Sequence, residues 1–213
     1  MAAKDKVKLL WSSPKLDRGL LLGHIGPYII SVETLQSLQP GRCLEDNAMD
    51  AYLFLQENGE YSKTLVLPHH LGTDILTRGK KDIKRKQQWK ERFLGADNII
   101  SVIYEPGHWS VMCADMVAGM FYHIDSMKIR DSKQEMENWS NFLSNLGITK
   151  EWKVATVNND FQQDSSLVEF MAVKFADTFA LEKNKSTCSF SLDANNVNDL
   201  RLAIAAKLVA AVD

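Results

Sequence analysis

Three apolar segments, separated only by short turns, constrain the fold of this chain more than any other feature. They cover residues 98–104, 108–114 and 119–125, with Pro106–Gly107 and Met116–Val117 between them. Val, Ile, Phe and Tyr suit the half-buried surface of a sheet, and short connections between strands favour antiparallel pairing. The three segments therefore predict the centre of an antiparallel or mixed sheet.

Helical periodicity surrounds these strands. Apolar residues spaced as in a helix predict helices beginning near residues 44, 133, 167 and 196, and shorter patterns predict strands at 64–67 and 152–157. Gly59 follows the first of these helices as a C-cap. Residues 1–27 lack a sustained period and predict a loosely packed N-terminal segment. With 213 residues, the chain is long enough for one substantial core. We expect residues 28–213 to form a single α+β domain, with helices flanking the sheet.

Charge and cysteine content exclude several classes of function. The 25 Lys and Arg residues nearly balance 27 Asp and Glu residues, which argues against a dedicated binder of nucleic acid or anionic membranes. The basic residues within 80–92 favour a solvated helix face, with a basic docking patch as the alternative. Three widely spaced cysteines without a CxxC pair favour neither disulfides nor zinc. We expect no metal or cofactor, and a reducing location in the nucleus or cytoplasm without membrane insertion.

The predicted hairpin brings together a histidine and an aspartate. A two-residue loop at Met116–Val117 would place His108 directly opposite Asp125 on the same sheet face. A carboxylate at this distance can fix the imidazole tautomer and stabilise imidazolium, as in the orienting half of a nucleophilic triad. An ordinary cross-strand pair at a sheet edge is the alternative. Cys113 alternates onto the opposite face, so it is poorly placed to serve His108 as a nucleophile.

Two segments resemble the ubiquitin-like protease family of papain-superfamily cysteine peptidases, which process and remove SUMO or NEDD8. They read GHWSVMCADMVAGMFYHIDSM from Gly107 and DFQQDSSLVEFMAVKFAD from Asp160. The family pattern is His–Trp on a strand, Asp–Ser at the end of the next, then Gln, five residues, and Cys–Gly opening a helix. CLEDNAMDAYLFL from Cys43 and DNIISVIYEPGHW from Asp97 are similar to two further family motifs. The resemblance spans about residues 27–209 and implies a papain-like fold.

The resemblance also implies roles for individual residues. His108 would be the general base and Asp125 its orienting partner, while the side-chain amide of Gln162 would stabilise the oxyanion of a tetrahedral intermediate. Trp109 would cover the Gly–Gly tail of a modifier in a narrow channel, because an aromatic face packs well against bare backbone. Asp46 would line the approach to that channel.

The chain departs from the family pattern where the nucleophile belongs. Val168 stands at the cysteine position and Glu169 at the glycine position. A valine side chain has no lone pair to attack a carbonyl and no proton for a base to remove, so the acyl-enzyme route is closed. Cys43 stands where the family has a tryptophan, which removes one expected aromatic wall of the tail channel.

Three hypotheses follow from this departure. The first is a catalytically impaired pseudoprotease that acts as a protein-binding or scaffolding module, possibly for a SUMO-type or NEDD8-type modifier. The alternative is an active isopeptidase with an unconventional nucleophile, for which Ser165, Ser166 and Cys43 are candidates, whereas Cys188 has no histidine beside it. The third is a scaffold that binds another protein and has lost modifier binding.

Overall fold

The computed structural model describes residues 2–13, 15–61, 63–106, 108–125, 132–155, 168–181 and 194–212. The chain divides into two compact units. Unit 1 combines both ends of the chain, Met1–Gly59 and Leu192–Asp213, and unit 2 is the continuous stretch Glu60–Ser191. The predicted single domain over residues 28–213 stays a prediction. Among the described residues, no helix combines the length and hydrophobicity needed to cross a bilayer.

Unit 2 alternates strands and helices and contains the strands that the sequence predicts. Its elements are, in chain order, β3 (Thr64–Leu67), α4 (His69–Leu76), α5 (Lys86–Gly95), β4 (Asn98–Glu105), β5 (His108–Asp115), β6 (Met120–Ile124), α6 (Lys133–Asn145), β7 (Lys153–Ala155) and α7 (Val168–Leu181). The predicted strand at 152–157 is confirmed in part, because only its residues up to 155 are described. The sequence did not predict α4.

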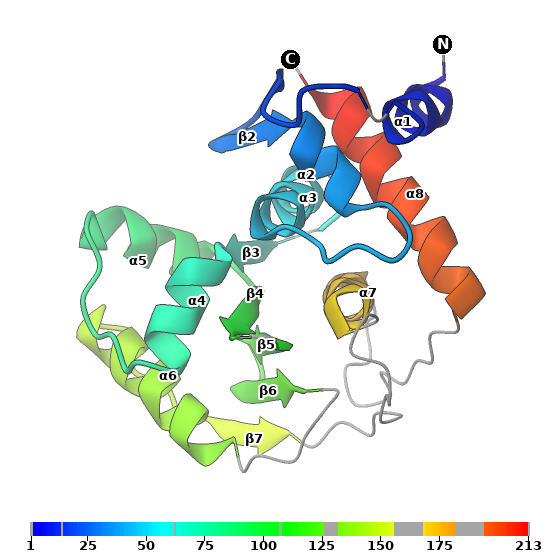
Figure 1. The fold of residues 1–213 in the computed structure, drawn as a ribbon. Coiled ribbons are helices and arrows are strands. Elements are labelled where there is room, and N and C mark those ends of the chain that lie inside the picture. The colour runs from blue at the N-terminus through cyan, green and yellow to red at the C-terminus, as the bar shows by residue number, and fades with distance from the viewer. Residues whose placement is uncertain are drawn as a thin grey trace. The chain divides into compact units, whose positions relative to one another are not determined.

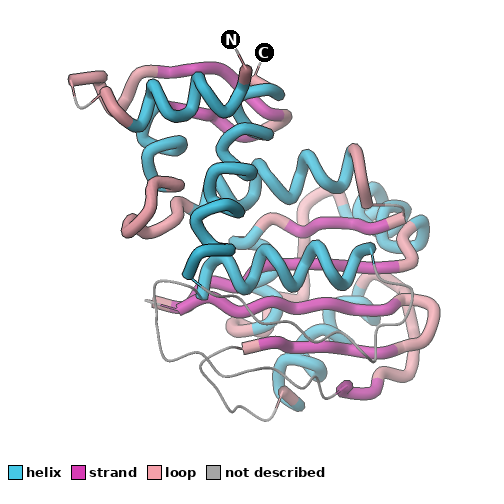
Figure 2. Tube along the Cα trace, turned by 90° about the vertical axis from the view of Figure 1, so that its right-hand side faces the viewer, coloured by secondary structure: helices cyan, strands magenta, loops and turns pink. Residues whose placement is uncertain are grey.

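The strands of unit 2 form one mixed sheet in the order β3-β4-β5-β6-β7. The central pairs β4–β5 and β5–β6 are antiparallel, and the outer pairs β3–β4 and β6–β7 are parallel. Figure 1 shows α4, α5 and α6 on one face of this sheet and α7 on the other. Figure 2 shows the strands side by side along their length. The predicted mixed sheet flanked by helices is therefore confirmed.

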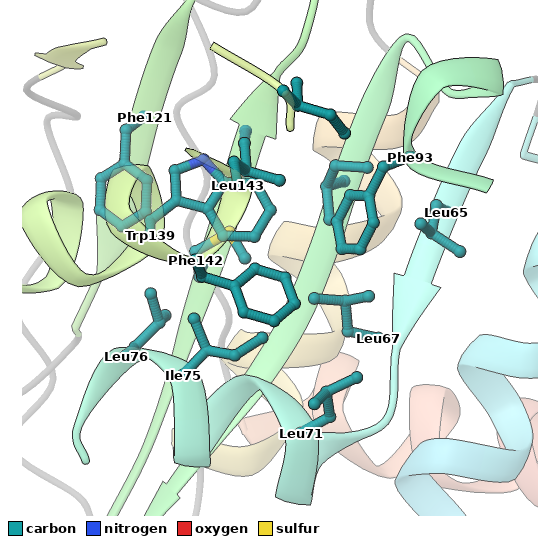
Figure 3. Packing of buried hydrophobic residues seen from close by; sticks show 14 of the residues in the cluster. Leu65, Leu67, Leu71, Ile75, Leu76, Phe93, Phe121, Trp139, Phe142 and Leu143 are labelled. Atoms are coloured by element: carbon teal, nitrogen blue, oxygen red, sulfur yellow. The ribbon is translucent and has the colours of Figure 1, made fainter. Parts of the chain in front are cut away.

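The face under α4, α5 and α6 carries the aromatic core of unit 2 (Figure 3). The Trp139 indole and the Phe93 and Phe142 rings lie with their centroids 5.8 to 6.4 Å apart, a spacing typical of favourable aromatic pairs. All three side chains are fully buried. On the opposite face, the Phe179 ring of α7 meets the Tyr122 ring of β6 edge-on. Both faces of the sheet are thus covered, which fixes the strands that carry the candidate site.

The β5–β6 hairpin has a longer loop than predicted. Its register pairs Asp115 with Met120, so four residues rather than two form the loop, and the predicted direct opposition of His108 and Asp125 is wrong. The Asp115 carboxylate accepts hydrogen bonds from the backbone N–H groups of Val117 and Ala118. Gly119 then closes the loop at a φ of 71°, which glycine adopts without strain. The register differs from the prediction by two residues, so every side chain keeps its predicted face.

Unit 1 is a helical unit with a small hairpin. Its elements are α1 (Ala3–Trp11), β1 (Leu21–Ile25), β2 (Tyr28–Ser31), α2 (Val32–Ser37), α3 (Asp46–Asn58) and α8 (Ala194–Ala211). Helices α3 and α8 confirm the helices predicted to begin near residues 44 and 196, and Gly59 is the C-cap of α3 as predicted. The prediction of a loosely packed segment over residues 1–27 is wrong for the described residues. Val7 of α1 is fully buried, and α1 packs against α8 from the other end of the chain.

Two polar contacts hold the middle of unit 1. The Ser31 and Thr34 side chains form a capping box at the start of α2, which satisfies backbone N–H groups there. From α8, the buried Arg201 guanidinium donates from Nη1 to the carbonyl oxygens of Gln39 and Arg42, at 2.8 and 2.9 Å. The loop between α2 and α3 is therefore anchored to the last helix of the chain.

Candidate functional site

A histidine–aspartate pair lies at one end of the β5–β6 hairpin. His108 is the first residue of β5, and Asp125 directly follows the last residue of β6. The Nε2 atom of His108 lies 2.7 Å from Oδ1 of Asp125, and the two side chains are 18% and 10% exposed. In the observed register they are diagonal neighbours on one sheet face, still within reach of each other. The predicted contact is therefore confirmed, although the predicted register is not.

This contact determines which imidazole nitrogen can act as a base. An ionised carboxylate only accepts hydrogen bonds, so the Nε2 atom of His108 carries a proton, and in the neutral imidazole the lone pair is on Nδ1. Nδ1 is buried and has no hydrogen-bond partner among the described residues. Buried polar atoms normally have partners, and an unpaired lone pair on an oriented imidazole is the form that a general base requires.

A second histidine, His123, forms a diagonal pair with Ser110 that has the same offset as the pair of His108 and Asp125. The Nε2 atom of His123 lies 3.0 Å from the Ser110 hydroxyl oxygen, and its Nδ1 atom lies 3.4 Å from the Ser132 hydroxyl oxygen. Ser132 is the N-cap residue of α6. His123 thus ties the hairpin to the helix that covers it. The sequence analysis did not single out His123, although the spacing that pairs His108 with Asp125 also pairs Ser110 with His123.

Trp109 points to the other face of the sheet and lies in an aromatic cluster. Its ring centroid is 4.8 Å from that of Tyr104, its partner on β4, and 6.1 Å from that of His69 at the start of α4. Trp109 is only 7% exposed, whereas Tyr104 is 42% exposed. The outer aromatic surface of this cluster therefore belongs to Tyr104. The sequence analysis missed Tyr104 and His69. A two-residue turn at Pro106–Gly107 is the signal that could have placed Tyr104 opposite Trp109, whereas the contact of His69 depends on the position of α4.

The residue predicted for the nucleophile position is the first described residue of α7, which spans Val168–Leu181. Its assignment to that position stays a prediction. Gln162, the predicted oxyanion residue, lies outside the described residues, as do Ser165, Ser166 and Cys188. The α7 helix is fixed to its own unit by Asp177, whose carboxylate accepts a hydrogen bond from the Tyr61 hydroxyl group.

Cys43 and Asp46, predicted to line the tail channel, belong to unit 1. The Cys43 thiol is exposed and lines a cavity of about 280 Å³. Its other lining residues are polar or charged: Arg18, Glu33, Ser37, Arg42 and Glu45. Partial burial raises the pKa of the Glu45 carboxyl, and the neighbouring carboxylates of Glu33 and Asp46 also raise it. Asp46 itself is exposed at the start of α3.

Cys113, the other cysteine among the described residues, has a buried thiol. Its side chain is fully buried on β5, on the face of the sheet opposite to His108. A fully buried residue cannot meet a peptide substrate, and its β-strand alternation turns it away from the base. Cys113 is therefore poorly placed to serve His108, as the sequence predicts.

No protein-family model matches the sequence, and a search of curated proteins gives no match. The fold, however, is similar to those of solved SUMO proteases. The SUMO protease Ulp1 with its catalytic cysteine oxidised to a sulfinic acid matches with a TM-score of 0.80 and 15% identity, over 98% of this chain and 94% of that chain. The Ulp1 protease domain in complex with Smt3, the yeast ortholog of SUMO, matches with a TM-score of 0.79, 16% identity and the same coverage.

An Ulp1-like SUMO protease catalytic domain from Chaetomium thermophilum also matches, with a TM-score of 0.72 and 16% identity, over 99% of this chain and 89% of that chain. This chain therefore has the fold of the Ulp1 protease domain, with a mixed sheet flanked by helices, as the sequence predicts.

Proposed function

We propose that this chain, which has the fold of the Ulp1-like SUMO proteases, is a pseudoprotease that binds a ubiquitin-like modifier or another protein without cleaving it. The observation that carries this proposal is the residue at the start of α7. Helix α7 begins at Val168, and a valine offers neither a nucleophilic atom nor a proton for His108 to remove.

His108 and Asp125 keep the geometry of a catalytic base and its orienting partner. Nδ1 of His108 is oriented by Asp125 and has no partner among the described residues, which is the arrangement that would activate a neighbouring thiol. With no thiol at position 168, the oriented imidazole has no proton to accept. We infer that His108, Asp125 and Gln162 are relics of a catalytic site, with the first two kept in place by the hairpin.

The modifier is the partner that the structural likeness favours. One of the similar structures is a complex with Smt3, which is described as the yeast ortholog of SUMO. In this chain Trp109, Asp46 and Cys43 would contact the C-terminal tail of such a modifier, with Cys43 in place of a bulky aromatic. The smaller side chain removes apolar contact area, so tail binding would be weaker than in a protease with two aromatic walls.

Titration of labelled SUMO, NEDD8 and ubiquitin against the protein tests binding. We expect a saturable change in fluorescence anisotropy with one modifier and weaker binding when its two C-terminal glycines are deleted. Replacement of Trp109 by alanine should reduce binding in the same way. No change at high micromolar concentration of any modifier would contradict modifier binding and favour a scaffold for another protein.

An electrophilic probe tests the absence of catalysis separately. A modifier that carries a C-terminal vinyl sulfone reacts with an activated nucleophile at the end of the tail channel. We expect no covalent adduct by mass spectrometry. An adduct that disappears when Cys43 or Ser166 is replaced by alanine would refute the pseudoprotease proposal and establish the isopeptidase alternative.

A further inference from the structure

Unit 2 carries a strongly basic segment at residues 78–92, hereafter the basic segment. It contains eight Lys or Arg residues and two Asp or Glu residues, which gives a charge of +6 within a chain whose net charge is −2. The rest of the chain therefore carries −8. Such a concentration of one sign produces a local field that attracts oppositely charged partners.

Most cations of the basic segment lie outside the ion pairs that the described residues form. Asp74 of α4 forms ion pairs with Arg78 and Lys80 at the start of the segment, and these contacts lower the pKa of its carboxyl. The two acidic residues within the segment contact neutral amides: Asp82 accepts from Asn145 Nδ2 and Glu91 from Gln87 Nε2. Five cations form no ion pair with a described residue: Lys81, Lys84, Arg85, Lys86 and Lys90.

The backbone that carries these cations is held in place. The Lys80 N–H donates to the Asp74 carbonyl oxygen, which ties the start of the segment to α4. The Asn145 side chain of α6 donates to the Lys81 carbonyl oxygen and to the Asp82 carboxylate, at 2.6 and 2.9 Å. Helix α5 then begins at Lys86. A partner would therefore meet cations on an ordered backbone, which lowers the entropy lost on binding.

Two observations favour an acidic peptide over a nucleic acid. Single-stranded nucleic acids bind to open aromatic faces, but the guanidinium of Arg92 lies over the Trp89 ring, 4.8 Å from its centroid. A long polyanion would also extend beyond the basic segment toward a chain whose remaining charge is −8. A short acidic peptide contacts the local cations alone.

We propose that the basic segment docks an Asp/Glu-rich peptide segment of a partner protein. The surface uses none of the candidate-site residues, so it does not depend on the pseudoprotease proposal. Each exposed ion pair contributes little to binding, so several must act together to give measurable affinity. Binding should therefore weaken steeply as salt is added, because exposed charges are screened over about 10 Å at 0.1 M ionic strength.

Fluorescence anisotropy with a labelled 12-residue peptide of alternating Asp and Glu residues tests the proposal at low salt. The test variant is Lys81→Glu, Lys84→Glu and Lys86→Glu, which changes three exposed side chains, and we expect the Kd to rise at least tenfold. The matched control is Lys4→Glu, Lys6→Glu and Lys8→Glu on α1, which makes the same charge change at exposed positions of unit 1. We expect it to bind within about twofold of the original protein.

Three results would overturn the proposal. The first is no binding of the acidic peptide at millimolar concentration, and the second is an equal loss in the α1 control, which would indicate net charge alone. The third is tighter binding of a 12-base-pair DNA duplex than of the peptide at the same salt. If the test variant with three glutamates does not fold, a neutral variant takes its place: Lys81→Gln, Lys84→Gln and Lys86→Gln. Unchanged peptide binding by that variant would also refute docking at this surface.

Discussion

The close packing of α4 on β4 predicts how much a substitution at Gly72 would change the stability. Gly72 lies in α4 directly above Ser101 of β4. A Cβ atom at Gly72 would lie 1.9 Å from Ser101 Oγ, 2.7 Å from Ser101 Cβ and 3.0 Å from Ile103 Cδ1. Ser101 is fully buried, and its hydroxyl donates to the Leu67 carbonyl oxygen at 3.3 Å, so it has little room to move. Gly72→Ala must therefore push α4 away from the sheet.

Two opposing contributions determine how much Gly72→Ala changes the free energy of unfolding. Overpacking of a core costs about 1–3 kcal/mol and occasionally more, and contacts as short as these belong at the upper end. Alanine offsets up to about 1 kcal/mol of this, because glycine is a poor helix former. We expect Gly72→Ala to lower the free energy of unfolding by about 2 kcal/mol. In a protein of this size that corresponds to a fall in Tm of roughly 4–8 °C.

Chemical denaturation followed by tryptophan fluorescence measures this change. Gly95→Ala is the matched control, since a Cβ atom there meets nothing within 4 Å, and it should be neutral or slightly stabilising. Ser101→Gly removes both Ser101 atoms that the new methyl group would meet. The double variant Gly72→Ala/Ser101→Gly should therefore be more stable, by at least 1 kcal/mol, than the sum of the single effects predicts.

The same movement should reach the aromatic cluster. Thr73 Oγ1 accepts a hydrogen bond from the Tyr104 backbone N–H at 3.0 Å, and His69 of the same helix contacts Trp109. Displacement of α4 should alter the native tryptophan emission as well as the stability. Stability of Gly72→Ala within 0.5 kcal/mol of the original protein, or additive effects in the double variant, would refute the reasoning from close packing.

Three further predictions concern the nucleophile position, the buried Arg201 and the ion-paired Asp74. Val168→Cys with Glu169→Gly should give a thiol that forms an adduct with a modifier vinyl sulfone, because the oriented imidazole of His108 would accept its proton; an unreactive thiol would indicate that the site has collapsed. Arg201→Met should destabilise unit 1 by about 2–4 kcal/mol in urea denaturation, since two carbonyl oxygens lose a buried charged donor. Asp74→Asn should cost about 0.5 kcal/mol at pH 7 and low salt. Because the folded-state pKa of Asp74 is lowered, this contribution is present above the unfolded pKa of about 3.9 and is lost as the pH falls through the folded pKa. The variant and the original protein should therefore converge in stability once the pH lies below the folded pKa.

The hairpin illustrates what a sequence can predict about a site. Alternation along a strand depends only on odd and even positions, so the shared face of His108 and Asp125 was predictable without the correct loop length. The loop itself depends on the Asp115 side chain, which binds backbone N–H groups within the turn, and on the left-handed conformation of Gly119. Such local turn chemistry competes with the two-residue turn that the apolar pattern favours.

The elements that the sequence missed depend on contacts between distant residues. Helix α1 is short and Val7 is its only buried residue, because the surface that covers it comes from α8, nearly two hundred residues later. Helix α4 contains two histidines and the buried Gly72, a residue unfavourable in isolated helices.

Unit 1 combines two segments that are far apart in the sequence, and this affects the order in which the two units can fold during synthesis. Unit 2 is continuous, so its sheet can form while the ribosome is still adding later residues, whereas α1, α2 and α3 emerge first and lack α8. Until α8 arrives, no Arg201 side chain is present to hold the loop between α2 and α3, and the buried side of α1 stays uncovered. Helices α1 to α3 are thus made before unit 2 but reach their final packing only after it, when α8 has been made.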